Sequence, residues 1–449
     1  MKIRELITVT NAETGDLPVG ILEKDVRIST DTRTITEGDF YLPLKGASFD
    51  GEKFIEQALE KGAIGSFYTK KLSACQEGET AQSTKEGILI KVSDTLIAYL
   101  QLANYRRNQI NPTVVAITGS SGKTTTKELV ASVLGEKYKT FKTPLNHNNE
   151  IGLCQTIFEM PDDTEVLVLE MGMRGLGEIE LLSKYAEPDM SIICNVGTAH
   201  IGRLGSRENI AKAKCEIVSY QKGKYFIAHD DELIRNTVEF DGEKVYYSLK
   251  DVNILEKNAN YSKFEYQKNI YELNAGGDYN IENAISAIIC GNKLGLDVNE
   301  IQEGLKKYHP IEKRWAGVNV NGFEVINDSY NANPESMKAF VDTIFDLYKD
   351  YTLVLGDMGE LGVNEIQYHK ELGQYINNHK KLNPNTTVIT IGTLSESISN
   401  EITNCKGVNF KDIESAVEYI KNNIQKGRRI FLKASRSMKF ERIIDSLKS

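Results

Sequence analysis

The chain has 449 residues, a length that accommodates about three domains of roughly 150 residues each. Its hydrophobic and charged fractions, 40% and 26%, are those of an ordinary soluble globular protein. A net charge of −9 argues against a nucleic-acid-binding protein, which usually carries a basic face. No stretch is apolar enough for a signal peptide or a membrane span. The six cysteines are isolated, without a CxxC pair, so we expect no zinc cluster or disulfide framework and a cytoplasmic protein.

The first block of the chain, residues 1–110, mixes short strands with helices. Strand-like runs lie around residues 27–29 and 40–44, and helical patterns follow at 54–61 and 95–107. The pair Asn111-Pro112 is typical of a break between elements. We therefore predict a small α/β domain over residues 1–110.

From residue 114 onward, apolar strands alternate with helices. In residues 111–312 the predicted strands are 114–118, 166–170 and 190–195, and the predicted helices are 125–134, 177–185, 206–220 and 281–294. Residues 313–449 repeat the alternation, with strands at 324–327, 352–355, 387–391 and 429–433. This pattern predicts an α/β fold of parallel sheets covered by helices on both faces. Because ligands bind at the carboxyl ends of strands in such sheets, the candidate site lies in the loops that follow them.

The loop after the first of these strands is typical of a phosphate-binding site. Its residues are Gly119, Ser120, Ser121, Gly122, Lys123, Thr124 and Thr125. The two glycines let backbone N–H groups converge on phosphate oxygens at a helix N-terminus. Lys123 adds a positive charge, and the Thr124 hydroxyl is placed to bind Mg²⁺. Ile117 stands where the longer phosphate loop has glycine, so we assign the loop to a shorter GxxGKT class; the alternative is an ordinary strand–turn–helix corner.

Two further side chains, Glu170 and His200, each follow a predicted strand. Glu170 ends the run VLVLE, and His200 lies just beyond the run MSIICNV. In a parallel sheet both would lie at the same edge as the phosphate loop, where carboxylate and imidazole groups can hold a divalent cation. The alternatives are a solvated acid at a strand end and a structural or surface histidine.

A lysine in the helix SRENIAKAKCEIVSY lies on the apolar face of that helix. Lys214 is four residues from both Ile210 and Val218, whereas Lys212 points to the opposite side. A lysine among core-facing residues is costly unless its amine reaches solvent or finds a strong partner. Lys214 is therefore either a lysine that extends to the surface or a chemically modified lysine that serves as an anionic ligand.

These features occur together with other motifs in an order that is typical of one enzyme family. The motifs are LNHNNEIG, LEMG, NVGTAHIGRLGSRENIAKAK, NDSYNANPESM, GDMGELG and KASRSMKFE. By them the sequence resembles the Mur ligases. SYNANPESM and GDMGELG make it similar to the member that adds D-alanyl-D-alanine to UDP-N-acetylmuramoyl-tripeptide, and the DNPR motif of the ligase for the third residue is absent.

The resemblance implies three α/β domains. Residues 1–110 would hold the uridine end of the substrate, residues 111–312 would form a P-loop ATPase-type domain, and residues 313–449 a Rossmann-like domain that closes over the site. It also implies two Mg²⁺ ions, one held by Thr124 and the other by Glu170, His200 and a carbamylated Lys214. Lys212 remains the alternative within the AKAK motif, although the helix face favours Lys214.

The resemblance extends to binding residues. For ATP it implies, besides the loop, Asn283, Arg314 and Asp328; Tyr279 stands where the family often has histidine. For the substrates it implies Thr32, Arg33, Asn146, Asn148, Tyr330, Asn331, Lys433, Ser435 and Arg436. Local alternatives are turn-forming asparagines near residue 146 and a solvated basic loop at 433–436. His369 also matches the family, but on a helix we expect it to be structural.

The implied reaction is ATP-dependent amide ligation. ATP would phosphorylate the tripeptide carboxylate, and the amine of D-alanyl-D-alanine would attack the acyl phosphate, with lysine or diaminopimelate equally compatible at the third position. We expect a monomer that binds neither nucleic acid nor membrane. Three alternatives remain: another ligase of the superfamily, such as a folylpolyglutamate synthase; a GTPase, although the guanine-reading NKxD motif is absent; and a non-catalytic binding protein.

Overall fold

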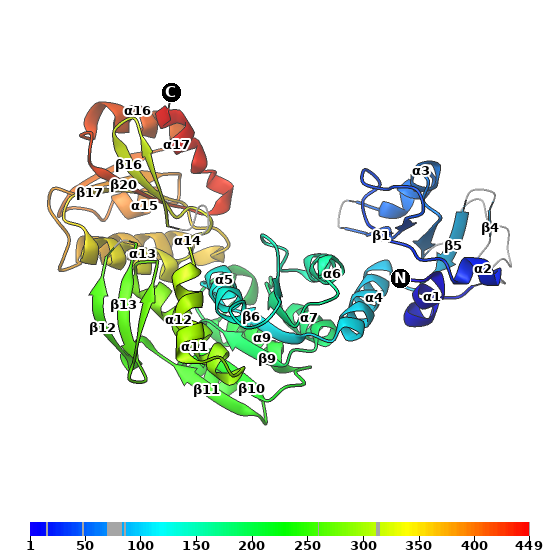
Figure 1. The fold of residues 1–449 in the computed structure, drawn as a ribbon. Helices are drawn as coiled ribbons and strands as arrows, with labels where there is room; N and C mark the ends of the chain where they lie inside the picture. Colours follow the sequence, from blue (N-terminus) through cyan, green and yellow to red (C-terminus); the bar gives the residue numbers. More distant parts are fainter. Residues whose placement is uncertain are drawn as a thin grey trace. The chain divides into compact units, whose positions relative to one another are not determined.

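The computed structural model of the protein describes residues 1–14, 17–46, 49–69, 83–84, 87–258, 260–310 and 315–448. The chain divides into two compact units (Figure 1). The first comprises Met1–Pro112 and His147–Asp163, and the second comprises Thr113–Asn146 and Thr164–Ser449. Residues 147–163 of the predicted central domain thus group with the first unit, and the second unit holds the rest of that domain from residue 113 together with the predicted C-terminal domain.

The first unit is built on a sheet of five short strands in the order β1-β2-β3-β5-β4. The strands are β1 (Ile28–Ser29), β2 (Phe40–Tyr41), β3 (Gly65–Tyr68), β4 (Ser83–Thr84) and β5 (Gly87–Lys91), and only β4 runs antiparallel. The helices are α1 (Ile3–Thr10), α2 (Val19–Leu22), α3 (Ile55–Glu60), α4 (Thr95–Ile110) and α6 (Glu150–Glu159). The predicted helix at 54–61 is α3, preceded by a 3-10 turn, η1 (Gly51–Phe54). Helix α4 packs against α1 and α6 (Figure 1), and Tyr99 stacks on Phe158.

The central sheet of the second unit is wholly parallel, in the order β11-β10-β9-β6-β8-β7. Its strands are β6 (Thr113–Thr118), β7 (Thr140–Lys142), β8 (Val166–Glu170), β9 (Met190–Ile193), β10 (Tyr225–His229) and β11 (Glu243–Tyr247). The helices are α5 (Lys123–Leu134), α7 (Glu178–Ala186), α8 (Ile201–Leu204), α9 (Arg207–Cys215), α10 (Glu232–Thr237), α11 (Asp278–Lys293) and α12 (Val298–Lys307). The predicted helix at 206–220 is shorter than expected, because α9 gives way to a 3-10 turn, η2 (Glu216–Val218).

A three-stranded antiparallel sheet follows in the chain and was not predicted. Its strands are β12 (Val252–Lys257), β13 (Ser262–Tyr266) and β14 (Asn269–Leu273), visible beside α11 and α12 in Figure 1. Buried and partly exposed residues alternate along β13, as expected for a sheet with one face on the core. Phe264, Tyr271 and Leu273 join the apolar core that α5 and α11 share with the central sheet.

The C-terminal part carries a second large sheet, in the order β15-β16-β20-β17-β18-β19. Its strands are β15 (Ala316–Val320), β16 (Phe323–Asn327), β17 (Tyr351–Gly356), β18 (Thr387–Ile391), β19 (Lys406–Phe410) and β20 (Arg429–Lys433), and only β15 is antiparallel to its neighbour. The helices are α13 (Pro334–Leu347), α14 (Glu365–Asn377), α15 (Glu396–Ser399), α16 (Ile413–Asn423) and α17 (Glu441–Lys448). The predicted strands 166–170, 387–391 and 429–433 are confirmed with their bounds.

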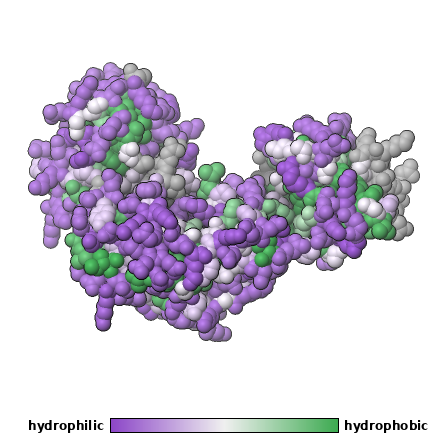
Figure 2. Space-filling view, in the orientation of Figure 1, coloured by the Kyte–Doolittle hydropathy of each residue, from purple (hydrophilic) through white to green (hydrophobic). Residues whose placement is uncertain are grey.

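Both faces of the C-terminal sheet are buried. Leu353 and Leu355 of β17 belong to one apolar cluster, and Val354 between them belongs to another. Because successive side chains of a strand point to opposite faces, helices must cover both sides of this sheet. This confirms the predicted α/β class with parallel sheets. Hydrophilic side chains cover most of the face drawn in Figure 2, and in the described ranges no helix combines the length and apolar character that crossing a membrane requires.

Candidate active site

The predicted phosphate loop lies between the carboxyl end of β6 and the N-terminus of α5. Gly122 has a φ of +81°, and a Cβ there would lie 2.6 Å from Oδ1 of Asn283. Only glycine satisfies both the left-handed backbone and this close approach. Lys123 folds back over the loop, and its ammonium donates to the carbonyl of Gly119 at 2.8 Å. The loop thus presents a lysine beside a helix N-terminus, an arrangement suited to binding phosphate.

Asn195, which the sequence analysis did not single out, braces this loop from the segment after β9. Its Oδ1 accepts from the backbone N–H of Ser121 at 3.0 Å, and its Nδ2 donates to the Ser121 carbonyl at 3.2 Å. Next to it, the hydroxyl of Ser120 accepts from the N–H of Gly197 at 2.9 Å. These bonds hold the loop in one shape without using Lys123.

Glu170 is the last residue of β8 and is 5% exposed. The strand register places it opposite Ile117, next to the beginning of the phosphate loop. Its backbone N–H donates to the hydroxyl of Thr143 at 3.0 Å, and Oε2 lies 3.9 Å from the ammonium of Lys127. The carboxylate is therefore buried at the carboxyl edge of the sheet, where the sequence analysis expected it.

His200 lies in the loop between β9 and α8 with a φ of 66°, an uncommon backbone for a residue other than glycine. Its Nδ1 lies 2.5 Å from Oε2 of Glu360, which belongs to the GDMGELG segment. Burial lowers the pKa of His200; the Glu360 carboxylate opposes this effect, and the charges of Lys123 and Lys214 add to it. The lowered pKa favours the neutral imidazole, which is the form that binds metal ions.

Lys214 in α9 is 1% exposed, whereas Lys212 is exposed. This is the arrangement that the helix-face argument predicts, and it excludes a Lys214 side chain that extends to the surface. Burial lowers the pKa of Lys214 well below its ordinary value, and the charge of Lys123 lowers it further. In the part of the chain that the structure describes, its amine makes no hydrogen bond or ion pair. Such surroundings favour the neutral, nucleophilic form of the amine over the ammonium.

Cys194 follows β9, and its backbone N–H donates to the carbonyl of Thr118 at the end of β6. Its buried thiol lies within the influence of several candidate residues. Burial raises its pKa to about 11, the charges of Lys123 and Lys214 act to lower it, and that of Glu170 acts to raise it. The charges of the same two lysines lower the pKa of His200. The structure therefore brings Lys123, Glu170, His200 and Lys214 together at one edge of the central sheet.

The C-terminal sheet gathers a second set of predicted residues at its own carboxyl edge. The ammonium of Lys433 lies 2.5 Å from Oδ2 of Asp328 and also contacts the carbonyl of Asn331 at 3.3 Å. Lys433 and Ser435 are buried, so the alternative of a solvated basic loop does not describe them. The Ser435 hydroxyl accepts from the N–H of Gly359 at 2.7 Å, and the exposed Arg436 pairs with Glu441. Lys433 and Arg436 therefore do not form one cluster.

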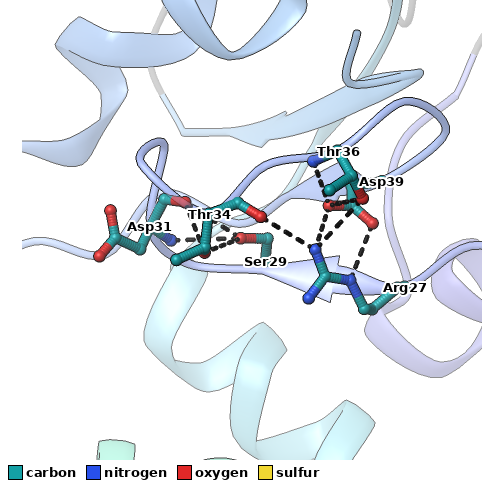
Figure 3. A network of polar contacts seen from close by, with 6 residues as sticks. All are labelled: Arg27, Ser29, Asp31, Thr34, Thr36 and Asp39. Atoms are coloured by element: carbon teal, nitrogen blue, oxygen red, sulfur yellow. Dashed lines mark hydrogen bonds and ion pairs between the residues drawn. The ribbon is translucent and has the colours of Figure 1, made fainter. Parts of the chain in front are cut away.

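The predicted uridine-side residues lie in the first unit, on a loop held by a polar network (Figure 3). Arg27 pairs with Asp39, and the hydroxyls of Ser29 and Thr34 bind the turn at Asp31. On this turn, Arg33 pairs with Asp31 at 2.7 Å while remaining 86% exposed. Thr32 donates to the side chain of Gln57 at 3.3 Å. The network fixes the loop and leaves Arg33 at the surface.

The remaining predicted residues are distributed between the two units. Asn146 is exposed at the end of one segment of the second unit, and Asn148 is partly buried in the first unit. Asn283 is buried against the phosphate loop, where its Oδ1 accepts from the hydroxyl of Thr126 at 3.2 Å. Tyr330 is partly exposed after β16. Arg314 lies outside the described residues.

Other groups that shape the site were not anticipated from the sequence. Glu335, at the start of α13, accepts from the hydroxyl of Thr198 at 2.8 Å, two residues before His200. His369 is buried with both ring nitrogens engaged: Nε2 accepts from the N–H of Met358, and Nδ1 contacts the carbonyl of Glu365. This agrees with the structural role expected for His369 and shows that it supports the segment carrying Glu360.

Comparisons with known proteins agree with this arrangement. Family models match in chain order: "Mur ligase family, catalytic domain" over residues 26–107, "Mur ligase middle domain" over 117–291, and "Mur ligase, glutamate ligase domain" over 313–436. The chain is 36% identical to UDP-N-acetylmuramoyl-tripeptide–D-alanyl-D-alanine ligase of Bacillus subtilis over 436 residues, covering 94% of this chain and 92% of that protein.

Solved structures show the same similarity. MurF from Acinetobacter baumannii superposes with a TM-score of 0.88 at 27% identity, covering 100% of this chain and 98% of that one. The MurF ligase from Thermotoga maritima, solved in complex with ADP, has a TM-score of 0.82 at 27% identity, with 94% and 97% covered. Similarity along nearly the whole chain, together with the phosphate loop and the residues gathered at its edge, shows that this protein belongs to the Mur ligase family.

Proposed function

We propose that the protein is an ATP-dependent ligase that joins D-alanyl-D-alanine to UDP-N-acetylmuramoyl-tripeptide. The observation that carries this proposal is the gathering of Lys123, Glu170, His200 and Lys214 around a phosphate loop, in a chain similar throughout to ligases of that name. ATP phosphorylates the terminal carboxylate of the tripeptide, and ADP leaves. The amine of the dipeptide then attacks the acyl phosphate through a tetrahedral intermediate, and phosphate leaves as the amide forms.

The residues of the phosphate loop, from Gly119 to Thr125, would hold the triphosphate. The loop ends at the N-terminus of α5, where helix N–H groups suit a phosphate, and Lys123 would offset negative charge on the transferring phosphoryl group. Asn283, Arg314 and Asp328 would complete the nucleotide site. Asn283 is already bonded to the helix that follows the loop, so its contribution includes holding the loop in place.

Lys214 would carry a carbamate. A neutral amine can add CO₂ and release a proton, which turns a buried base into an anionic oxygen ligand. Among the described residues no three His, Cys, Asp or Glu side chains form a metal-binding group, so Glu170 and His200 supply only two ligands by themselves. A carbamate at Lys214 would supply a third, and its oxygen together with that of Glu170 would suit Mg²⁺, with Thr124 holding a second ion. Bound Mg²⁺ would offset the repulsion between the triphosphate and the substrate carboxylate.

The substrate residues are assigned on the same basis. Thr32 and Arg33 would bind the uridine end, and the exposed guanidinium of Arg33 would have to be shared with Asp31. Asn146, Asn148, Tyr330, Asn331, Lys433, Ser435 and Arg436 would contact the peptide parts. Lys433 is engaged with Asp328, so a substrate carboxylate would have to share its ammonium with that acid. We place the reaction in the cytoplasm, where ATP is available, and assign it to a monomer.

The test is phosphate release from ATP with UDP-muramoyl tripeptide and D-alanyl-D-alanine, separately and together. We expect release only when both are present, with a product whose mass is the sum of the two substrates less one water. Comparing the tripeptide substrate that has lysine at its third residue with the one that has diaminopimelate there would show which of the two the enzyme uses. Release without the dipeptide, or turnover with glutamate in place of it, would overturn the proposal in favour of another ligase of the superfamily.

A further inference from the structure

A second buried lysine, Lys127, lies one turn of α5 beyond Lys123 and is 1% exposed. The reaction proposed above assigns it no role. An ammonium so deeply buried is costly unless its surroundings compensate for the lost hydration. The surroundings of Lys127 therefore indicate what holds it there.

The ammonium of Lys127 meets three segments of the second unit. It donates to the carbonyl of Thr143 at 2.8 Å and to that of Leu145 at 3.4 Å, both in the segment after β7. It also lies 3.2 Å from Oε1 of Glu128 and 3.9 Å from Oε2 of Glu170. One side chain thus connects α5, the 143–146 segment and the carboxylate at the end of β8.

Thr143 strengthens the connection between the segment and Glu170. Its backbone N–H donates to the carbonyl of Val168 at 2.9 Å, and its hydroxyl accepts from the N–H of Glu170 at 3.0 Å. The segment is therefore tied to β8 by its own backbone and to α5 by Lys127. Loss of Lys127 would release the carbonyls of Thr143 and Leu145 while leaving the bonds to β8 in place.

The local charges decide whether Lys127 attracts or repels a cation at Glu170. Lys127 is nearer to Glu128 than to Glu170, and Glu128 also pairs with Lys142. The group thus contains two positive and two negative side chains, which are Lys127, Lys142, Glu128 and Glu170. Glu128 therefore offsets part of the charge of Lys127 and weakens the repulsion between Lys127 and a cation at Glu170.

We propose that Lys127 is a positioning residue that holds the Glu170 carboxylate and the 143–146 segment in the arrangement used for cation binding. This inference rests on the proposed function, because it takes Glu170 as a cation ligand. Partners of a metal-binding carboxylate orient it and keep it ready for the ion. Lys127 would act in this way from the first turns of the helix that begins at the phosphate loop.

The experiment measures Mn²⁺ binding to the full chain in the presence of ADP, by the electron paramagnetic resonance signal of free Mn²⁺. We expect Lys127→Met to weaken Mn²⁺ binding by about 10- to 100-fold, as does loss of a metal ligand's partner elsewhere. Glu170→Gln serves as the positive control. Lys142→Met is the matched control, because Lys142 pairs with Glu128 from a side chain that is 43% exposed and has no contact with Glu170 in the described structure; we expect a change below about twofold.

A second readout is independent of metal. In Lys127→Met, the backbone amide of Thr143, which donates to the Val168 carbonyl, should exchange with solvent about tenfold faster or more, because its segment loses its anchor to α5. In Lys142→Met this amide should exchange as in the parent protein. Lys127→Gln retains an amide donor for the Thr143 carbonyl without the charge. We expect it to keep slow exchange while weakening Mn²⁺ binding.

Several outcomes would overturn the proposal. Unchanged or tighter Mn²⁺ binding in a folded Lys127→Met, with only a lower melting temperature, would make Lys127 structural. Failure of both Lys127 variants to fold would have the same meaning. If Glu170→Gln also leaves Mn²⁺ binding unchanged, the proposed cation site itself is wrong; if Glu170→Gln weakens binding and Lys127→Met does not, the proposed function stands and the role of Lys127 falls.

Discussion

Two buried lysines, one near the carboxyl edge of each large sheet, differ in what surrounds them. Lys433 ends β20 and has a carboxylate, Asp328, at 2.5 Å. Lys214 lies in α9 near the edge of the central sheet, where burial and the charge of Lys123 hold its pKa well below its usual range. In the described part of the molecule its amine has no hydrogen bond or ion pair.

The difference separates a lysine that an ion pair keeps charged from a lysine whose surroundings favour the neutral amine. A buried ammonium with a carboxylate beside it remains charged, and removing either partner leaves an uncompensated charge. A buried amine without a partner loses its proton instead, and a neutral amine is a nucleophile. Burial alone therefore does not indicate a nucleophilic lysine, whereas burial without a partner does.

The largest expected effect is on catalysis at Lys214. Lys214→Ala should lower the rate of ligation at least about 1,000-fold, ~4 kcal/mol of barrier, because no anionic ligand can form there. Phosphate release with both substrates measures it, with Lys212→Ala in the same helix as the control. Short carboxylates that enter the cavity should restore part of the activity. Full activity in Lys214→Ala would remove the carbamate from the proposal.

The two lysines should also differ in their effect on stability. Lys433→Met should lower the free energy of unfolding by about 3 kcal/mol, since it leaves the Asp328 carboxylate unpaired, and Asp328→Asn together with Lys433→Met should recover part of this loss. Lys214→Met should cost less than about 1 kcal/mol or increase stability, because it removes an amine that burial disfavours. Urea unfolding measures both. Equal destabilisation by Lys433→Met and Lys214→Met would contradict the comparison.

A smaller effect is expected at the phosphate loop, which the side chain of Asn195 braces. Asn195→Ala removes three hydrogen bonds between its side chain and Ser121, so ATP binding should weaken by about tenfold or more. Titration calorimetry with ATP measures this, and Asn253→Ala on the exposed side of β12 is the control. If ADP and ATP bind Asn195→Ala as tightly as the parent protein, the loop does not depend on this brace.

The smallest effect concerns pH and His369 in the C-terminal part. Burial lowers the pKa of His369, so below the ordinary value of 6.5 the unfolded chain binds a proton that the folded chain resists. The stability that this histidine contributes is present above that pH and is lost as pH falls toward the lowered pKa. When the pH is lowered from about 7.5 to about 5.5, the free energy of unfolding of the parent protein should therefore fall by about 1 kcal/mol more than that of the His369→Gln variant. Thermal unfolding at the two pH values tests this, and parallel curves would contradict it.

Some of this structure could be predicted because it leaves local signals in the sequence. The strands β8, β18 and β20 are short, strongly apolar runs, since neighbouring layers bury them on both faces. The three-stranded sheet escaped prediction because its signal is alternation, with Phe264 and Tyr266 inward and Lys263 and Glu265 only partly buried. A search for continuous apolar runs passes over such strands.

The residues that support the site were hidden for a different reason. Asn195 bonds to Ser121 from 74 positions away in the sequence, and Glu335 bonds to Thr198 from 137 positions away. From the sequence, Lys127 resembles an ordinary surface lysine of a helix, because no nearby residue indicates that the 143–146 segment covers it. Pairings over such distances follow from the fold and leave no local pattern.

The alternation of apolar strands with helices, the phosphate loop and the apolar face that carries Lys214 follow from the sequence by itself, because hydrophobic periodicity and glycine placement are local properties. Only the tertiary structure decided which buried charges have partners: Lys433 and Lys127 meet carboxylates, and Lys214 meets none in the described residues. The physical reason is that the state of a buried amine depends on the groups folded against it, and these come from distant parts of the chain.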